Sequence, residues 1–146
     1  MCGLAGLALR PGATAPEDAD TAPTMVQGAS DDFLGPLDDV PMPDEAHGID
    51  FEGELAVITG DVPMGATPEA ALEGVRLVML ANDWTLRDLV PAELAKGFGF
   101  LQGKPATAFS PLAVTPDDLG GSWSGGRVHL PLECRWNGRR VGLCDA

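Results

Sequence analysis

The feature that most constrains the fold is a pair of apolar stretches that lie close together in the chain. The first, Phe51 to Thr59, alternates between two faces with the two-residue period of a β-strand. The second, Val75 to Ala81, is almost wholly apolar, which is typical of a strand buried on both faces. Between them, Thr67 followed by Pro68 suits the start of a short helix over residues 68–74. We therefore expect a sheet built around these two strands, with short helices outside it.

Two glutamates lie on one face of the first strand. Glu52 and Glu54 are two residues apart, so their side chains project from the same side, about 7 Å apart at the backbone. Like charges that close disfavour each other unless a cation or protons intervene, and a hard divalent ion would resolve the conflict. The alternative is a strand with two solvated glutamates on its wet face. Ala56 and Ile58 weigh against that alternative, because they make the same face apolar further along.

A third acid, Asp83, follows the second apolar stretch. Binding groups often gather at the ends of buried strands in mixed α/β folds. Asp83 would complete a three-carboxylate site with Glu52 and Glu54 if the two strand ends meet. The spacing permits this arrangement without proving it.

Three sequence blocks, in this order and spacing, resemble the fumarylacetoacetate hydrolase family. They are Phe-Glu-Gly-Glu-Leu-Ala-Val (51–57), Leu-Ala-Asn-Asp-Trp-Thr-Leu-Arg-Asp-Leu (80–89) and Gly-Lys-Pro-Ala-Thr-Ala-Phe-Ser-Pro (103–111). Gln-Gly-Ala-Ser-Asp-Asp-Phe-Leu-Gly-Pro (27–36) resembles a further block of the family. The resemblance covers about residues 25–142.

The resemblance implies the C-terminal catalytic domain of that family, truncated at both ends. We expect a β-rich α+β fold, with a twisted mixed sheet that curls into a roll, and a homodimer. Residues 25–146 would form the partial catalytic domain. Residues 1–24 show no apolar period and would be a disordered or unrelated leader.

The resemblance also implies a chemistry. Members of the family hydrolyse a carbon–carbon bond in 1,3-diketo acids such as acylpyruvates and fumarylacetoacetate, and some relatives decarboxylate or isomerise. By this resemblance Glu52, Glu54 and Asp83 would bind Mg²⁺, with Ca²⁺ or Mn²⁺ as alternatives. Lys104 would be the catalytic group that stabilises an oxyanion, and Arg87 would bind a substrate carboxylate or orient the ligands. A cytoplasmic enzyme of aromatic amino acid catabolism is the corresponding expectation.

Two other interpretations stay open at this point. The family's histidine–glutamate pair activates water, but its segment has no recognised counterpart here, so no general base is assigned. The Gly-rich strand that closes the family's pocket is likewise not recognised. The chain could therefore be a catalytically incomplete fragment that only binds a divalent ion, or an acidic interaction module without a metal.

Composition narrows the classes of partner. The formal net charge of −13 and an isoelectric point of about 4.2 argue against nucleic acid and anionic membrane as partners. No apolar run approaches the roughly 20 residues of a membrane span. Three cysteines without a C-x-x-C motif favour free thiols in a reducing compartment.

The remaining patterns describe local structure. We expect a short strand near 24–27, a helical turn over 91–96, and strands 128–136 and 139–143 joined at Asn137-Gly138 by a type I′ turn. Thr115 followed by Pro116 predicts another short helix. Asp31 and Asp32 suit turns better than metal ligands, and His47 and His129 are given no catalytic role.

Overall fold

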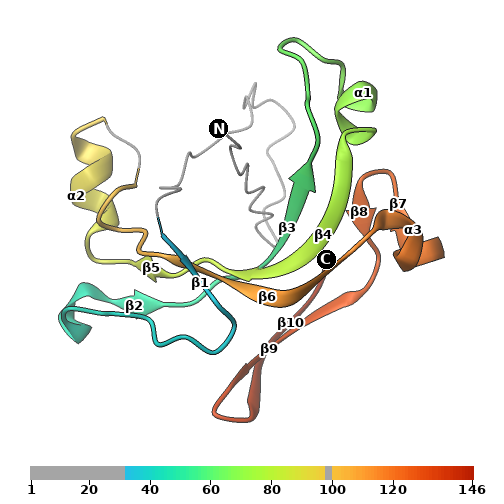
Figure 1. Cartoon of the computed structure of the whole chain (residues 1–146). Helices are drawn as coiled ribbons and strands as arrows, with labels where there is room; N and C mark the ends of the chain where they lie inside the picture. Colours follow the sequence, from blue (N-terminus) through green and yellow to red (C-terminus); the bar gives the residue numbers. More distant parts are fainter. Residues whose placement is uncertain (1–31, 98–99) are drawn as a thin grey trace, which may run out of the picture.

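The computed structural model describes residues 32–97 and 100–146 (Figure 1). The elements in chain order are β1 (Phe33–Leu34), the 3₁₀ helix η1 (Glu45–His47), β2 (Ile49–Asp50), β3 (Gly53–Thr59), α1 (Pro68–Leu72), β4 (Val75–Asn82), β5 (Thr85–Leu86), α2 (Val90–Ala95), β6 (Thr107–Val114), α3 (Pro116–Leu119), the 3₁₀ helix η2 (Gly120–Ser122), β7 (Trp123–Ser124), β8 (Arg127–Val128), β9 (Pro131–Trp136) and β10 (Arg139–Asp145). The expected leader 1–24, the strand near 24–27 and Asp31 lie outside the described residues.

A four-stranded sheet forms the centre of the fold, in the order β1-β6-β4-β3. Strand β1 runs parallel to β6, whereas the β6–β4 and β4–β3 pairs are antiparallel, so the sheet is mixed. Its long strands curve strongly, and the short helices lie at its margins (Figure 1). The expected β-rich α+β fold with a mixed sheet is therefore confirmed.

The pairing of β3 with β4 brings the candidate ligands together. Gly53 lies opposite Asn82, and Glu54 lies opposite Ala81. One residue beyond the ladder, the amide of Asp83 donates a hydrogen bond to the carbonyl of Glu52 at 3.0 Å. The start of β3 and the end of β4 thus lie side by side at the same end of the sheet.

The burial of β4 differs from the prediction for residues 75–81. Val78 and Ala81 are buried, but Arg76 is exposed and Leu80 is 49% exposed. The expectation of a strand buried on both faces is therefore wrong. An antiparallel sheet can leave part of a face open, and helices of four to six residues cover little of it.

The helix starts follow the sequence signals. Thr67 accepts a hydrogen bond from the amide of Ala70 at 3.3 Å, and α1 begins at Pro68, although it ends at Leu72 rather than at residue 74. Thr115 and Asp118 form a capping box at the start of α3. The helical turn expected over 91–96 is α2, shifted by one residue.

The C-terminal part contains two short strand pairs in place of one long strand. The chain expected as strand 128–136 divides into β8 and β9, because β8 pairs with β7 whereas β9 pairs with β10. Between them His129 donates its amide to the carbonyl of Ser122 at 2.7 Å. The turn between β9 and β10 has positive φ at Asn137 (48°) and Gly138 (77°), as a type I′ turn requires. Cys134 and Cys144 are free thiols, as expected.

Candidate metal centre

Three carboxylates converge where β3 begins and β4 ends. Glu52 and Glu54 project from the same side of the chain at β3, and Asp83 directly follows β4. One oxygen of each carboxylate lies within 4.8 Å of the others. The structure therefore brings together all three residues that the sequence analysis singled out as ligands.

Lys104 reaches this cluster from the chain between α2 and β6. Its Nζ donates to Glu52 Oε2 at 2.9 Å, to Asp83 Oδ2 at 2.8 Å and to Thr85 Oγ1 at 2.7 Å. The lysine side chain is only 14% exposed. An ammonium has three donors, and here all three are used.

Arg87 lies at the outer side of the cluster. Its guanidinium donates to Asp50 Oδ2 at 2.8 Å and to Glu52 Oε1 at 2.6 Å, and its side chain is 48% exposed. The pairing of β2 with β5 sets Asp50 opposite Thr85, two residues before Arg87. In this arrangement Arg87 orients a candidate ligand, and the predicted contact with a substrate carboxylate stays a prediction.

Three polar side chains that were not predicted from the sequence support the cluster. Thr85, which is fully buried, donates to Glu52 Oε1 at 3.1 Å while it accepts from Lys104. Thr107 donates to Asp83 Oδ1 at 3.1 Å, and Asn82 accepts from the amide of Glu52 at 3.2 Å. Each of these residues lies inside one of the two blocks 80–89 and 103–111. Their polar character within those blocks was the sequence signal that could have identified them as part of the site.

The surroundings of Glu52 and Glu54 shift their pKa values in opposite directions. For Glu52, burial favours the neutral acid, but the hydrogen bond and charge of Lys104, with Arg87 and Thr85, outweigh it and lower the pKa. For Glu54, burial and then the charges of Asp83 and Glu52 raise the pKa to about 7. Among the described residues, no cation lies within ion-pair distance of the Glu54 carboxylate.

This donor set fits a hard divalent cation. When ionised, the three carboxylates and the single ammonium carry a net charge of −2, which one divalent ion would balance. All three ligand atoms are carboxylate oxygens, which Mg²⁺ and Ca²⁺ prefer. Burial and then the charges of Asp83 and Glu52 raise the pKa of Glu54, and a bound cation would offset both effects.

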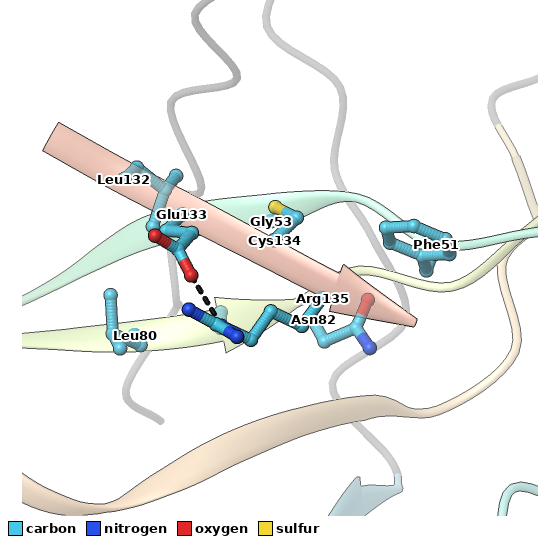
Figure 2. Close-up of a pocket in the computed structure, with 9 residues that line it drawn as sticks. Phe51, Gly53, Leu80, Asn82, Leu132, Glu133, Cys134 and Arg135 are labelled. Atoms are coloured by element: carbon cyan, nitrogen blue, oxygen red, sulfur yellow. Dashed lines mark hydrogen bonds and ion pairs between the residues drawn. The ribbon is translucent and has the colours of Figure 1, made fainter. Parts of the chain in front are cut away.

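A hollow of about 180 Å³ lies elsewhere, where β9 crosses β3 and β4 (Figure 2). Phe51 and Gly53 line it, and because Glu52 and Glu54 alternate with them, the carboxylates face away from it. Figure 2 shows Gly53 next to Cys134 and, on the side of the hollow formed by β9, an ion pair between Glu133 and Arg135. The hollow is thus separate from the acidic cluster.

Comparisons with known proteins agree with the three sequence blocks. The family described as "Fumarylacetoacetate (FAA) hydrolase C-terminal" matches residues 6–144. The chain is 29% identical over 122 residues to "Oxaloacetate tautomerase fahd2, mitochondrial" of Xenopus laevis, covering 82% of the chain and 36% of that relative. It is 31% identical over 103 residues to "2,4-didehydro-3-deoxy-L-rhamnonate hydrolase" of Sphingomonas sp. (strain SKA58), covering 68% of the chain and 35% of the relative.

The chain thus spans about a third of the length of these curated relatives. The family match includes most of residues 1–24, and the domain boundary drawn after residue 24 stays a prediction. In the described part of the chain, no helix is long and apolar enough to cross a membrane. The match over residues 6–144 and the mixed sheet that presents the acidic cluster lead to one conclusion: the chain belongs to the fumarylacetoacetate hydrolase C-terminal domain family.

Proposed function

We propose that this chain provides the metal-binding centre of an enzyme that hydrolyses a carbon–carbon bond in 1,3-diketo acids. The observation that carries the proposal is the convergence of Glu52, Glu54 and Asp83 beside the ammonium of Lys104. Mg²⁺ is the ion we expect there, with Ca²⁺ or Mn²⁺ as alternatives. When bound, such an ion supplies Lewis-acid polarisation of a dicarbonyl group.

Lys104 is suited to hold negative charge that develops on the substrate. In the proposed hydrolysis, water gives up one proton as its oxygen bonds to one carbonyl carbon, and the bond from that carbon to the central carbon breaks. The electron pair of the broken bond leaves as an enolate, which then takes up a proton. A nearby ammonium stabilises the enolate oxygen by donating a hydrogen bond to it.

The contacts of Lys104 indicate which of its three N–H groups would donate to the substrate. Two of its acceptors are carboxylates and the third is the hydroxyl of Thr85. Hydrogen bonds between charged groups are stronger than those to a neutral hydroxyl. We therefore expect a substrate oxygen to replace Thr85 as the third acceptor of Lys104.

Turnover tests the proposed hydrolysis directly. Purified protein is mixed with an acylpyruvate and Mg²⁺, and the loss of diketone absorbance is followed against buffer and against protein with chelator. Metal-dependent loss supports the proposal, and no loss above buffer removes it. Oxaloacetate is run in parallel, since one relative is named an oxaloacetate tautomerase; interconversion of its keto and enol forms without cleavage favours a tautomerase instead.

Calorimetry tests the metal centre apart from turnover. Mg²⁺ is titrated into the wild type and into Glu54→Ala, with Glu69→Ala as an exposed control on α1. Binding by the wild type and the control, together with loss in Glu54→Ala, supports the centre. Identical heats in all three proteins would show that Glu54 does not bind the metal ion. The interpretation as an acidic interaction module without a metal would then remain.

A further inference from the structure

Glu93 on α2 has a role that neither the sequence blocks nor the family match assigns. Its carboxylate accepts hydrogen bonds from three consecutive backbone amides beyond the end of α2. Oε1 accepts from Leu101 at 3.2 Å and from Gln102 at 2.7 Å, and Oε2 accepts from Gly103 at 3.0 Å. The next residue is Lys104, whose ammonium joins the acidic cluster.

Gly103 is the link between Glu93 and the site. Its amide is held by Glu93, while its carbonyl accepts from the amide of Leu86 at 2.8 Å. Leu86 adjoins Thr85, which accepts a hydrogen bond from Lys104. The backbone that carries Lys104 is thus fastened on one side to α2 and on the other to β5.

The position of Gly103 leaves no room for a side chain. A Cβ there would lie 2.9 Å from Glu93 Oε2 and 3.1 Å from Val90 Cγ2. Gly103 is also buried. The close approach of this backbone to the carboxylate therefore depends on both residues.

We propose that Glu93 is a positioning residue that fixes the backbone of residues 101–103 and thereby sets the ammonium of Lys104 among Glu52, Asp83 and Thr85. Three amides converging on one carboxylate form charge-assisted hydrogen bonds, which are stronger than neutral ones. They also lower the pKa of Glu93, led by the bond from Gln102, so the group is ionised at neutral pH. The effect of this positioning on catalysis rests on the proposed function. The positioning of the Lys104 ammonium by Glu93 does not depend on it.

The chain offers an internal reference for a test, because Lys96 and Lys104 are its two lysines. Lys96 is exposed at the end of α2, whereas the side chain of Lys104 is only 14% exposed and is hydrogen-bonded. Brief labelling of the metal-free protein with acetic anhydride, followed by peptide mass spectrometry, gives the ratio of modification at Lys104 to that at Lys96. This ratio reports how firmly the ammonium of Lys104 is held, without metal or turnover.

We expect the ratio to rise about tenfold in Glu93→Ala and less in Glu93→Gln, which keeps one acceptor oxygen, because hydrogen bonds to a charged group no longer hold the loop. Gly103→Ala should raise it too, since the new methyl displaces the carboxylate. Because Glu93 also lies near Lys96, the absolute extent of modification at Lys96 is recorded for each variant beside the ratio.

Two control variants keep the test decisive. Glu69→Gln removes an exposed first-turn glutamate from α1 and should leave the ratio unchanged. Val78→Ala destabilises the buried centre of β4 away from the loop and reports labelling through general unfolding. An unchanged ratio in the Glu93 variants overturns the proposal, and so does an equal rise in Val78→Ala at a matched loss of melting temperature.

A second readout applies if the protein turns over diketo acids. Glu93→Gln should then lower kcat while the affinity for Mg²⁺, measured by titration, stays at the wild-type value. If the protein does not turn over, the proposed function fails, but the labelling ratio still decides the role of Glu93.

Discussion

At the scale of single residues, the two glutamates at the start of β3 have different electrostatic environments. Glu52 is surrounded by Lys104, Arg87 and Thr85, whereas Glu54 faces Asp83 and Glu52 and has Lys104 only as a more distant charge. The same residue type, two positions apart, is thus ionised in one case and near half-protonated at neutral pH in the other. The difference depends on which carboxylate Lys104 contacts.

The raised pKa of Glu54 predicts that binding of Mg²⁺ releases a proton. Between pH 4.5 and about 7 the folded, metal-free protein holds a proton on Glu54 that the unfolded chain lacks, so its stability falls as pH rises through that window. A metal ion must displace this proton, so affinity should increase with pH across the same window. Calorimetry in buffers of different ionisation enthalpy should show release approaching one proton at acidic pH and little well above pH 7. Release of the same number of protons at every pH would contradict the prediction.

Lys104→Met should separate metal binding from chemistry. The variant removes a positive charge from beside the proposed ion, so Mg²⁺ should bind at least as tightly as to the wild type. Without metal, Glu52 and Asp83 lose their shared partner, and we expect about 1–3 kcal/mol of lost stability. Turnover of an acylpyruvate should disappear because the donor to the enolate is missing. Lys96→Met is the matched control and should change none of these quantities.

At the scale of elements, β9 packs closely against the start of β3. A Cβ on Gly53 would lie 2.5 Å from the Sγ of Cys134, so the glycine permits this approach. The carboxylates of Glu52 and Glu54 are on the other side of β3. Contact with β9 therefore supports the strand that presents them.

Gly53→Ala should destabilise the protein by about 1–3 kcal/mol, because β9 must move away from the added methyl group. Replacing Cys134 by Ala removes the Sγ that clashes, so Gly53→Ala combined with Cys134→Ala should recover part of the loss. Chemical denaturation of both single variants and the double variant measures this coupling. Cys144→Ala in place of Cys134→Ala is the control and should not recover stability. Additive effects of Gly53→Ala and Cys134→Ala would contradict the close contact.

At the scale of the whole molecule, the described residues bury a small set of apolar side chains, namely Ala56, Val78, Ala81, Leu86 and Val128. Many large apolar side chains are exposed, among them Leu37 and Leu112. Single exposed apolar residues are normal on protein surfaces. The homodimer expected from the family resemblance stays a prediction, which light scattering of the purified protein would test.

A metal ion should stabilise this fold measurably. An ion that binds only the folded state adds about 2.7 kcal/mol to the free energy of unfolding when its concentration is 100 times its Kd. Mg²⁺ should therefore raise the melting temperature of the wild type. Glu54→Gln should show a much smaller rise, because the isosteric amide cannot supply the third negative charge. A melting temperature of the wild type that is insensitive to Mg²⁺ would favour an interaction module without a metal.

Local patterns in the sequence were sufficient for many elements of the fold. The alternation over 51–59 predicted β3, the Thr-Pro pairs predicted the starts of α1 and α3, and Asn137-Gly138 predicted the hairpin of β9 and β10. These signals depend on backbone geometry and capping within a few residues, so they need no knowledge of distant contacts. The split of 128–136 was missed, because the change from β7 to β10 as pairing partner is a long-range event.

By itself, the sequence determined the strand β3, the two-residue spacing that puts Glu52 and Glu54 on one side of the chain at its start, and the three blocks that place the chain in its family. Only the tertiary structure decided that Asp83 and Lys104 reach that face, that Arg87 turns to Asp50 and Glu52, and that Glu93 holds the backbone before Lys104. The physical reason is that spacing along one strand fixes neighbours two residues apart. Contacts between residues tens of positions apart depend on strand register and on the packing of side chains.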